Sequence, residues 1–308
     1  MDLAELGRQL RETHWGWAAI ATALAPAQIW ARARRWVYLF PPGSNPAGLV
    51  PATWIGYMAN NILPLRAGEF VRVYVVSRRW KVPAGGGRAH GFWTTLATLV
   101  VERALDGLAV VLILALLILA IPVPAYLQVA ALVLLALDLV GIAALAAFVV
   151  APGACERLIA RVAGRWPALE RRLRRAFETF VTGLDGVRAP GHLLPLLAWS
   201  VIVWVIPALA MWTMLVAMNL HLPWVAGFAV LAFVGLGVSI PSAPGYVGVF
   251  HAAAALAVGL FGVSQSAAVG YALVLHASQI VPVTLIGWLY LLREHMSLGE
   301  ATHAQPPA

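Results

Sequence analysis

Long apolar stretches are the feature of this sequence that most restricts its fold. A helix that crosses the roughly 30 Å hydrocarbon core of a bilayer needs ~20 apolar residues. Five segments meet this length, at residues 15–36, 92–120, 124–150, 192–218 and 267–292. Overall, 61% of the residues are hydrophobic and 11% are charged, whereas soluble domains are near half apolar and about a quarter charged. We therefore predict an all-α polytopic membrane protein and exclude a soluble globular one.

Three further apolar segments, at 48–63, 223–240 and 248–262, are shorter and lie beside clusters of glycine and proline. The break from Pro241 to Gly248 holds two prolines and two glycines, so a helix cannot continue through it. Non-helical backbone at membrane depth is tolerated only where protein buries it or where it lines a wet cavity. We interpret 48–63 as a re-entrant hairpin. The other two segments form either a second hairpin, which we favour, or two crossings joined by a cytoplasmic turn.

Basic residues set the predicted orientation and organisation. Arginines cluster in residues 151–191, which marks this loop as cytoplasmic, and within it Leu169 to Leu184 has an amphipathic helical pattern suited either to an anionic leaflet or to a solvated loop helix. We expect a single integral-membrane domain in pseudo-inverted halves. It comprises a first half (1–150), the basic linker (151–191), a second half (192–293) and a disordered, cytoplasmic tail (294–308).

The charge balance concerns possible partners. The chain has 21 Lys+Arg against 13 Asp+Glu, a net charge of +8, and Lys81 is its only lysine. Guanidinium groups bind phosphate and carboxylate in a bidentate manner, although an arginine-biased genome would give the same composition. A membrane accounts for the charge better than nucleic acid does. The lone Cys155 excludes an intrachain disulfide.

Ionisable residues lie inside one predicted span. Glu102, Arg103 and Asp106 fall near the middle of 92–120, with Glu102 ~15 Å from the start of the helix. Each such charge costs at least ~2.5 to 3.5 kcal/mol in a bilayer, so intramembrane ionisable groups indicate a functional site. The structural alternative is an ion pair that fixes helix packing. Two acids and one base leave a surplus negative charge that needs another cation.

The first broken segment offers such cations. The run from Asn60 to Arg72 contains two amides, two arginines and a carboxylate: Asn60, Asn61, Arg66, Glu69 and Arg72. Arg66, Glu69 and Arg72 recur every three residues and would share one helical stripe. The arginines could chelate a phosphate while Glu69 orients one of them. Alternatively, they are interfacial arginines that extend toward lipid headgroups.

The second broken segment contributes Gly245 and Gly248, which would expose backbone amides. A helix that starts near Val249 would aim its positive N-terminus at the break, with His251 in its first turn. His251 could relay protons or serve only as a packing hydrogen-bond partner. Asp138, in the span 124–150, is isolated and we identify no partner for it.

Several catalytic and nucleotide-binding motifs are absent from the sequence. It has no Gly-x-x-x-x-Gly-Lys-Ser/Thr loop, His-Glu-x-x-His, Gly-x-Ser-x-Gly or Cys-x-x-Cys. We therefore expect no cofactor, no metal and no nucleotide-driven pump. A membrane-embedded transferase that uses Glu69, Glu102 or Asp106 as its carboxylate stays open.

Three motifs together resemble the lysylphosphatidylglycerol synthase transmembrane-region family of flippase-like proteins. They are Asn60-Asn61 with Pro64, Arg66, Gly68-Glu69 and Arg72; Glu102-Arg103 with Asp106; and Pro244-Gly245-x-x-Gly248. The resemblance extends over roughly 15–293 and implies a multi-pass protein of the bacterial or archaeal inner membrane, related to the flippase half of the multiple peptide resistance factor. Because only a short tail to Ala308 follows the last predicted helix, where the family's synthases have an aminoacyl-transferase domain, we expect no aminoacyl-lipid synthesis by this chain.

Two departures from the family pattern stand out. Similar members usually have a further crossing before the position of Met1, and His251 stands about where the family commonly has a glutamate. If that glutamate couples transport to protons, this chain is expected to couple transport differently.

The expected function is a flippase that moves an anionic or phosphate-bearing (glyco)lipid between leaflets, and the expected chain is not an enzyme. The alternatives are a membrane-embedded lipid or glycan transferase and a scaffold of an envelope-lipid biosynthesis complex. Membrane lipids are the expected partners, with a homo-oligomer or envelope-biosynthesis enzymes as further ones. The predicted substrate-binding residues are Asn60, Asn61, Arg66, Glu69, Arg72, Glu102, Arg103, Asp106, Pro244, Gly245, Gly248 and His251.

Overall fold

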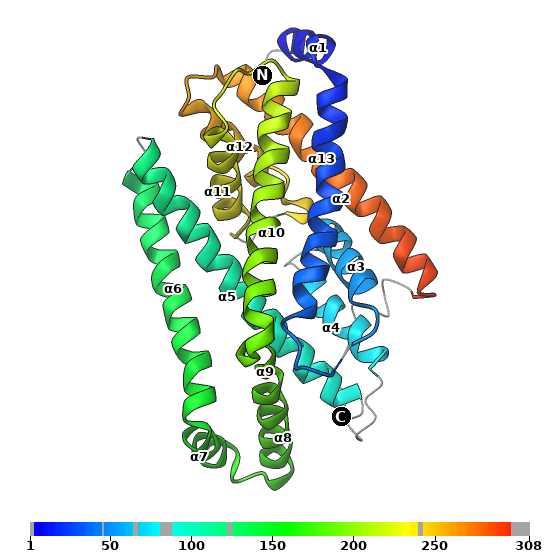
Figure 1. Cartoon of the computed structure of the whole chain (residues 1–308), viewed down its shortest axis with the longest axis vertical. Coiled ribbons are helices and arrows are strands. Elements are labelled where there is room, and N and C mark those ends of the chain that lie inside the picture. Colours follow the sequence, from blue (N-terminus) through cyan, green and yellow to red (C-terminus); the bar gives the residue numbers. More distant parts are fainter. Residues whose placement is uncertain are drawn as a thin grey trace.

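The computed structural model describes residues 3–44, 46–63, 67–80, 88–121, 125–239 and 243–296. Within these ranges the chain is helical and contains no strand, as predicted (Figure 1). The elements are α1 (Leu3–Glu12), α2 (Trp15–Val37), α3 (Leu49–Ile62), α4 (Gly68–Arg78), α5 (Arg88–Ala120), α6 (Ala125–Val150), α7 (Pro152–Ala163), α8 (Pro167–Gly183), α9 (Asp185–Arg188), α10 (Pro190–Ala217), α11 (Val225–Ser239), the 3₁₀ helix η2 (Pro244–Tyr246), α12 (Val249–Gly259) and α13 (Gln265–Arg293).

Four helices in the described ranges are long and apolar enough to cross a membrane. They lie in α5, α6, α10 and α13 and coincide with four of the five predicted spans. The first predicted span, 15–36, forms the 23-residue helix α2 but carries Arg32, Arg34 and Arg35 near its end and is not among the four. The chain is thus a multi-pass membrane protein by the length and composition of its helices.

The three shorter apolar segments form short helices with nearly the predicted bounds. α3 has 14 residues, α11 has 15 and α12 has 11, and each is shorter than the ~20 residues that a crossing needs. α3 packs against α4, and α11 packs against α12. The two pairs meet in the interior, because a Cβ added to Gly245 would lie 3.2 Å from the carbonyl oxygen of Asn61.

The break between α11 and α12 has a backbone that favours glycine. Gly245 and Gly248 have φ angles of +67° and +87°, which lie in the left-handed region that residues with a Cβ seldom adopt. Tyr246 between them also has a positive φ, +58°. The predicted interruption is therefore a turn with a defined backbone conformation. Pro241 and Ser242 of the predicted break lie outside the described residues.

The α5–α6 hairpin stands apart from the rest of the bundle at one end (Figure 1). α6 packs against α5 and α7. Most of its apolar side chains are exposed, for example Leu132, Leu137 and Val140. In a membrane such a surface faces lipid, because exposed apolar area of this extent is unfavourable in water.

The predicted amphipathic helix is present as α8. Phe177 and Phe180 on its apolar side contact Phe148 of α6, with ring centroids 5.7 and 6.2 Å apart. Arg174 on the other side lies 3.2 Å from Glu156 of α7 and 3.1 Å from Glu170. These contacts hold the arginine-rich α7–α8 region at one end of the molecule (Figure 1).

Candidate functional site

A network of buried charges lies at the middle of α5. Asp106 faces two arginines of α2: its Oδ2 accepts a hydrogen bond of 2.9 Å from Arg32, and its Oδ1 lies 2.8 Å from Nη2 of Arg35. The side chain of Arg35 is 0% exposed and that of Arg32 is 8% exposed. The two positions are three residues apart on one helical face, so α2 directs both toward α5.

Glu102 connects this cluster of Asp106, Arg32 and Arg35 to α4. Arg72 donates two hydrogen bonds to the Glu102 carboxylate, Nη1 to Oε1 at 3.1 Å and Nη2 to Oε2 at 2.8 Å. Both side chains are 0% exposed. The Arg72 guanidinium also stacks on the ring of Trp36, 4.1 Å from the centroid. A bidentate pair of this kind is geometrically specific, so it fixes α4 against α5 and α2.

Arg103 completes the network and is its most exposed arginine, at 36% of its side chain. It donates a hydrogen bond of 2.7 Å to Glu102 Oε1 and lies 3.1 Å from Asp106 and 3.6 Å from Glu69. Counted over the described residues, the network holds four arginines against three carboxylates, a surplus of one positive charge.

The network has a surplus positive charge, whereas its members on α5 alone have a surplus negative charge. Its two acids and one base need a further cation, and the structure supplies Arg32, Arg35 and Arg72. Burying charges at this depth is unfavourable unless they are paired and hydrogen-bonded. Each of the three carboxylates is paired with at least one arginine, and Arg32 and Arg103 are the cations that reach the surface of a cavity.

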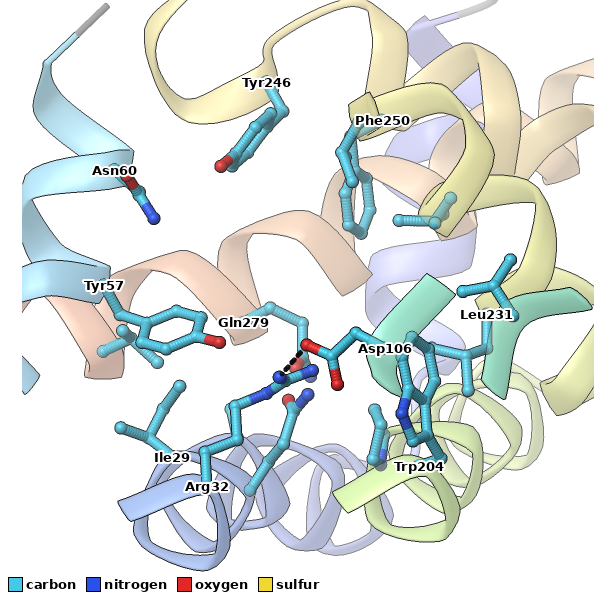
Figure 2. Close-up of a pocket in the computed structure, with 18 of the residues that line it drawn as sticks. Ile29, Arg32, Tyr57, Asn60, Asp106, Trp204, Leu231, Tyr246, Phe250 and Gln279 are labelled. Carbon is cyan, nitrogen blue, oxygen red and sulfur yellow. Dashed lines mark hydrogen bonds and ion pairs between the residues drawn. The ribbon is translucent and has the colours of Figure 1, made fainter. Parts of the chain in front are cut away.

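That cavity has a volume of about 410 Å³ and lies between helices from both halves of the chain. Figure 2 shows Arg32 and Asp106 on one side of it, with Asn60 and Tyr246 on the other. Its polar lining side chains come from α2, α3, α5, α6, η2 and α13; they are Gln28, Arg32, Tyr57, Asn60, Asn61, Arg103, Asp106, Asp138, Tyr246, His276 and Gln279. Apolar side chains such as Trp204, Leu231 and Phe250 line the rest.

Two glycines bring α3 and α4 close enough to place Arg72. A Cβ added to Gly68 would overlap the carbonyl oxygen of Gly56, and a Cβ added to Gly56 would overlap the Arg72 side chain. The N–H of Gly68 donates a hydrogen bond of 2.8 Å to Asn60 Oδ1. Asn60 therefore ties the start of α4 to the end of α3 and also lines the cavity.

Helix α13 joins the end of α3 to the η2 turn through two hydrogen bonds. Asn61 Nδ2 donates a hydrogen bond of 2.9 Å to Thr284 Oγ1, and Nε2 of His276 donates one of 2.8 Å to the carbonyl oxygen of Gly245. His276 also stacks on Phe250, with ring centroids 4.5 Å apart. The histidine thus fixes the turn that contains Gly245 beside the cavity.

The predicted site residues fall into three groups. Asn60, Asn61, Arg103 and Asp106 line the cavity. Glu69, Arg72 and Glu102 lie behind it in the charge network. Pro244, Gly245, Gly248 and His251 form the η2 turn and the start of α12 and are not cavity-lining residues, and Arg66 lies outside the described residues. His251 accepts a hydrogen bond of 3.3 Å from the N–H of Gly248, so its Nδ1 caps α12.

Sequence analysis did not assign Arg32 and Arg35 to the site. They lie at the end of a predicted span, where the positive-inside rule alone explains the presence of arginines. Their role as ion-pair partners of α5 was therefore not predicted. Their three-residue spacing in an apolar helix was the available signal, because it places both guanidinium groups on one face. Tyr57 and Trp204 were also missed, since an aromatic residue in a span is ordinarily packing material.

Fold and site together define an all-α membrane protein with a charged cavity between its helices. The sequence matches the family described as "Lysylphosphatidylglycerol synthase TM region" over residues 1–287. The chain therefore belongs to this family, as its three motifs indicated. No curated protein and no solved structure matches the chain significantly.

Proposed function

We propose that the chain is a lipid flippase, which moves a phosphate-bearing or otherwise anionic lipid between the leaflets of the membrane. One observation carries the proposal: a cationic network with one surplus charge, centred on the candidate membrane span α5, presents Arg32 and Arg103 to a cavity of about 410 Å³. A phosphate or carboxylate would be the complementary occupant, because guanidinium groups bind both in a bidentate manner.

We further propose that α3–α4 and α11–α12 are re-entrant pairs that enter from opposite faces and meet near the midplane. Their short lengths support this, as does the approach of Gly245 to Asn61. Such discontinuous helices in two halves mark the binding site of many transporters. α2 would also cross the membrane, because its Arg32 and Arg35 turn toward α5 and not toward lipid.

The proposed location is the cytoplasmic membrane of a bacterium or archaeon, with the α7–α8 region and the C-terminus in the cytoplasm. The exposed arginines of α7 and α8 support this orientation under the positive-inside rule. Exposed Trp15 and Trp224 lie at the other end of the bundle, at the beginnings of α2 and α11, where an aromatic belt is expected.

Transport is favoured over group transfer because the three carboxylates considered as catalytic candidates are all paired with arginines. Glu69, Glu102 and Asp106 each lie within ion-pair distance of at least one arginine. A carboxylate held by guanidinium groups is a poor general base. The same residues suit a site that binds an anion reversibly.

The experiment reconstitutes the protein in liposomes and measures leaflet exchange of a fluorescent phosphatidylglycerol by quenching from outside. We expect Arg103→Gln to lower the rate at least about tenfold, since it removes a charge-assisted contact to the headgroup. Arg172→Gln, on the exposed side of α8, serves as the matched control and should retain the wild-type rate.

A neutral glycolipid with the same fluorophore tests the role of the phosphate and should exchange much more slowly than phosphatidylglycerol. Equal exchange by wild type, Arg103→Gln and protein-free liposomes would refute transport. A covalently altered lipid in the mass spectrum would instead support a transferase.

A further inference from the structure

A second cavity lies beside the polar one and differs from it in chemistry. It is an apolar groove of about 640 Å³ between α6, α11 and α12. The lining residues are all apolar or glycine, among them Leu134, Phe233, Gly237, Ala252, Ala253 and Leu256.

The groove adjoins the polar cavity along one face of α6. Leu134 lines both of them, Asp138 lines the polar cavity, and Ala130 lines the groove. These three residues are spaced by four, so they form one stripe on the helix. Along this stripe the lining changes from a carboxylate to small and branched hydrocarbon within about two turns.

Small residues on α11 and α12 give the groove its depth. A Cβ added to Gly237 would lie 3.1 Å from the Cβ of Ala253 and 3.2 Å from Val249, so the glycine allows the two helices to approach closely. Ala252 is exposed in the groove. On the far side, α6 adds only apolar side chains and packs mainly against α5 and α7.

The chemistry of this groove selects one kind of occupant. An apolar surface gains nothing from water, which needs polar partners to be held in a cavity. At the depth of the membrane-spanning helices the available apolar solute is the hydrocarbon of a lipid. Because the groove adjoins the cavity where a headgroup is expected, with Leu134 lining both, a chain of the same lipid can occupy it while the headgroup stays with Arg103.

We propose that this groove binds an acyl chain of the transported lipid, and that the lipid therefore enters sideways between α6 and the α11–α12 pair. The proposal rests on the proposed function for the identity of the headgroup. It adds the chain-binding site and the side of the bundle through which substrate passes.

The test uses a phosphatidylglycerol with a photoreactive diazirine on one acyl chain, reconstituted with the full-length protein. Irradiation followed by mass spectrometry of the peptides maps the adducts. Adducts concentrated at Leu134, Ala252 and Leu256 are expected, and Arg103→Gln should reduce them several-fold because the headgroup no longer holds the lipid. Adducts spread evenly over the exposed apolar surface of α6 would overturn the proposal.

A matched pair of substitutions tests whether the groove is used. Ala252→Trp fills the groove from an exposed position, whereas Ala136→Trp adds the same side chain to an exposed site on α6 that lines neither cavity. We expect Ala252→Trp to lower exchange at least tenfold and remove the groove adducts, with Ala136→Trp close to wild type. Should Ala252→Trp not fold, the wild-type adduct map still decides.

Failure of this inference is distinguishable from failure of the proposed function. If wild type and Ala252→Trp exchange lipid at the same rate, transport stands and the groove is not its chain site. If wild type shows no exchange and a neutral lipid with the same diazirine chain labels the groove as strongly as phosphatidylglycerol, the groove is an ordinary lipid contact and the inference is overturned with it.

Discussion

Glu102 is the residue on which the charge network depends. It lies within 4.0 Å of Arg32, Arg35, Arg72 and Arg103, and its side chain is 0% exposed. Asp106 has a similar position one turn along α5, and its arginine partners among the described residues are Arg32, Arg35 and Arg103. We therefore expect stability to depend mainly on Glu102 and headgroup binding mainly on Arg103, two members of one network.

Two neutral substitutions separate these roles. Glu102→Gln should destabilise the protein by about 3–5 kcal/mol, because it leaves Arg72 buried without its main counter-charge and removes one of the two carboxylates beside Arg35. Arg103→Gln should cost about 1 kcal/mol or less, since Arg103 is 36% exposed and the remaining network is charge-balanced. Thermal unfolding in detergent measures both. Equal loss in the two variants would contradict this division.

Asp138 presents the opposite case, a carboxylate for which the described part of the chain provides no counter-charge. Its Oδ2 is buried with no hydrogen-bond partner among the described residues, and it packs against Gly107 of α5. Asp138→Asn should raise the stability by about 1 kcal/mol or more, because a neutral amide of the same shape is easier to bury. Chemical or thermal unfolding tests this, and an unchanged midpoint would show that the wild-type group carries no such cost.

At the scale of elements, close helix contacts position the site. The α3–α4 pair depends on Gly56 and Gly68, whose backbones approach so closely that neither position has room for a methyl group. This contact sets the height of Arg72 opposite Glu102 and that of Asn60 at the cavity wall.

Gly68→Ala should therefore destabilise the protein by several kcal/mol, because the clash is with the backbone and cannot be relieved by a rotamer change. Gly141→Ala on α6 is the control: a Cβ there meets nothing within 4 Å, and alanine favours helix by up to about 1 kcal/mol. The yield of monodisperse protein and the unfolding midpoint provide the readout. Comparable behaviour of the two variants would argue against a tight α3–α4 contact.

Sequence reasoning located the elements well because membrane helices are set by local hydropathy. The broken segment predicted at 48–63 is α3, Leu49–Ile62, and the amphipathic stretch Leu169 to Leu184 is α8, Pro167–Gly183. It located only part of the site. Glu102 and Asp106 were found from their depth in an apolar span, whereas the partnership with Arg32 and Arg35 depends on how α2 packs beside α5, which local pattern does not contain.

At the scale of the whole molecule, the two ends differ in chemistry. The α7–α8 end is rich in exposed arginine, and the beginnings of α2 and α11 carry exposed tryptophan. The 28-residue helix α10 connects the two ends (Figure 1) and at 1.5 Å per residue spans about 42 Å. This matches the full thickness of a bilayer with its interfacial regions.

The proposed orientation predicts opposite accessibility for two single cysteines in a Cys155→Ser background. Arg172→Cys on α8 should react with a membrane-impermeant maleimide only from the cytoplasmic side. His221→Cys, in the turn between α10 and α11, should react only from the outside. Reaction of both from the same side would refute the orientation.

The hydrogen bonds that join α13 to both α3 and the η2 turn have a mechanical consequence. Thr284 is hydrogen-bonded to the end of α3, and His276 is hydrogen-bonded to the η2 turn. The two segments also contact each other directly at Asn61 and Gly245. A movement of α3 or of the η2 turn would therefore strain the other one through α13. For the proposed transport, we therefore expect the two segments to move together and not independently of each other.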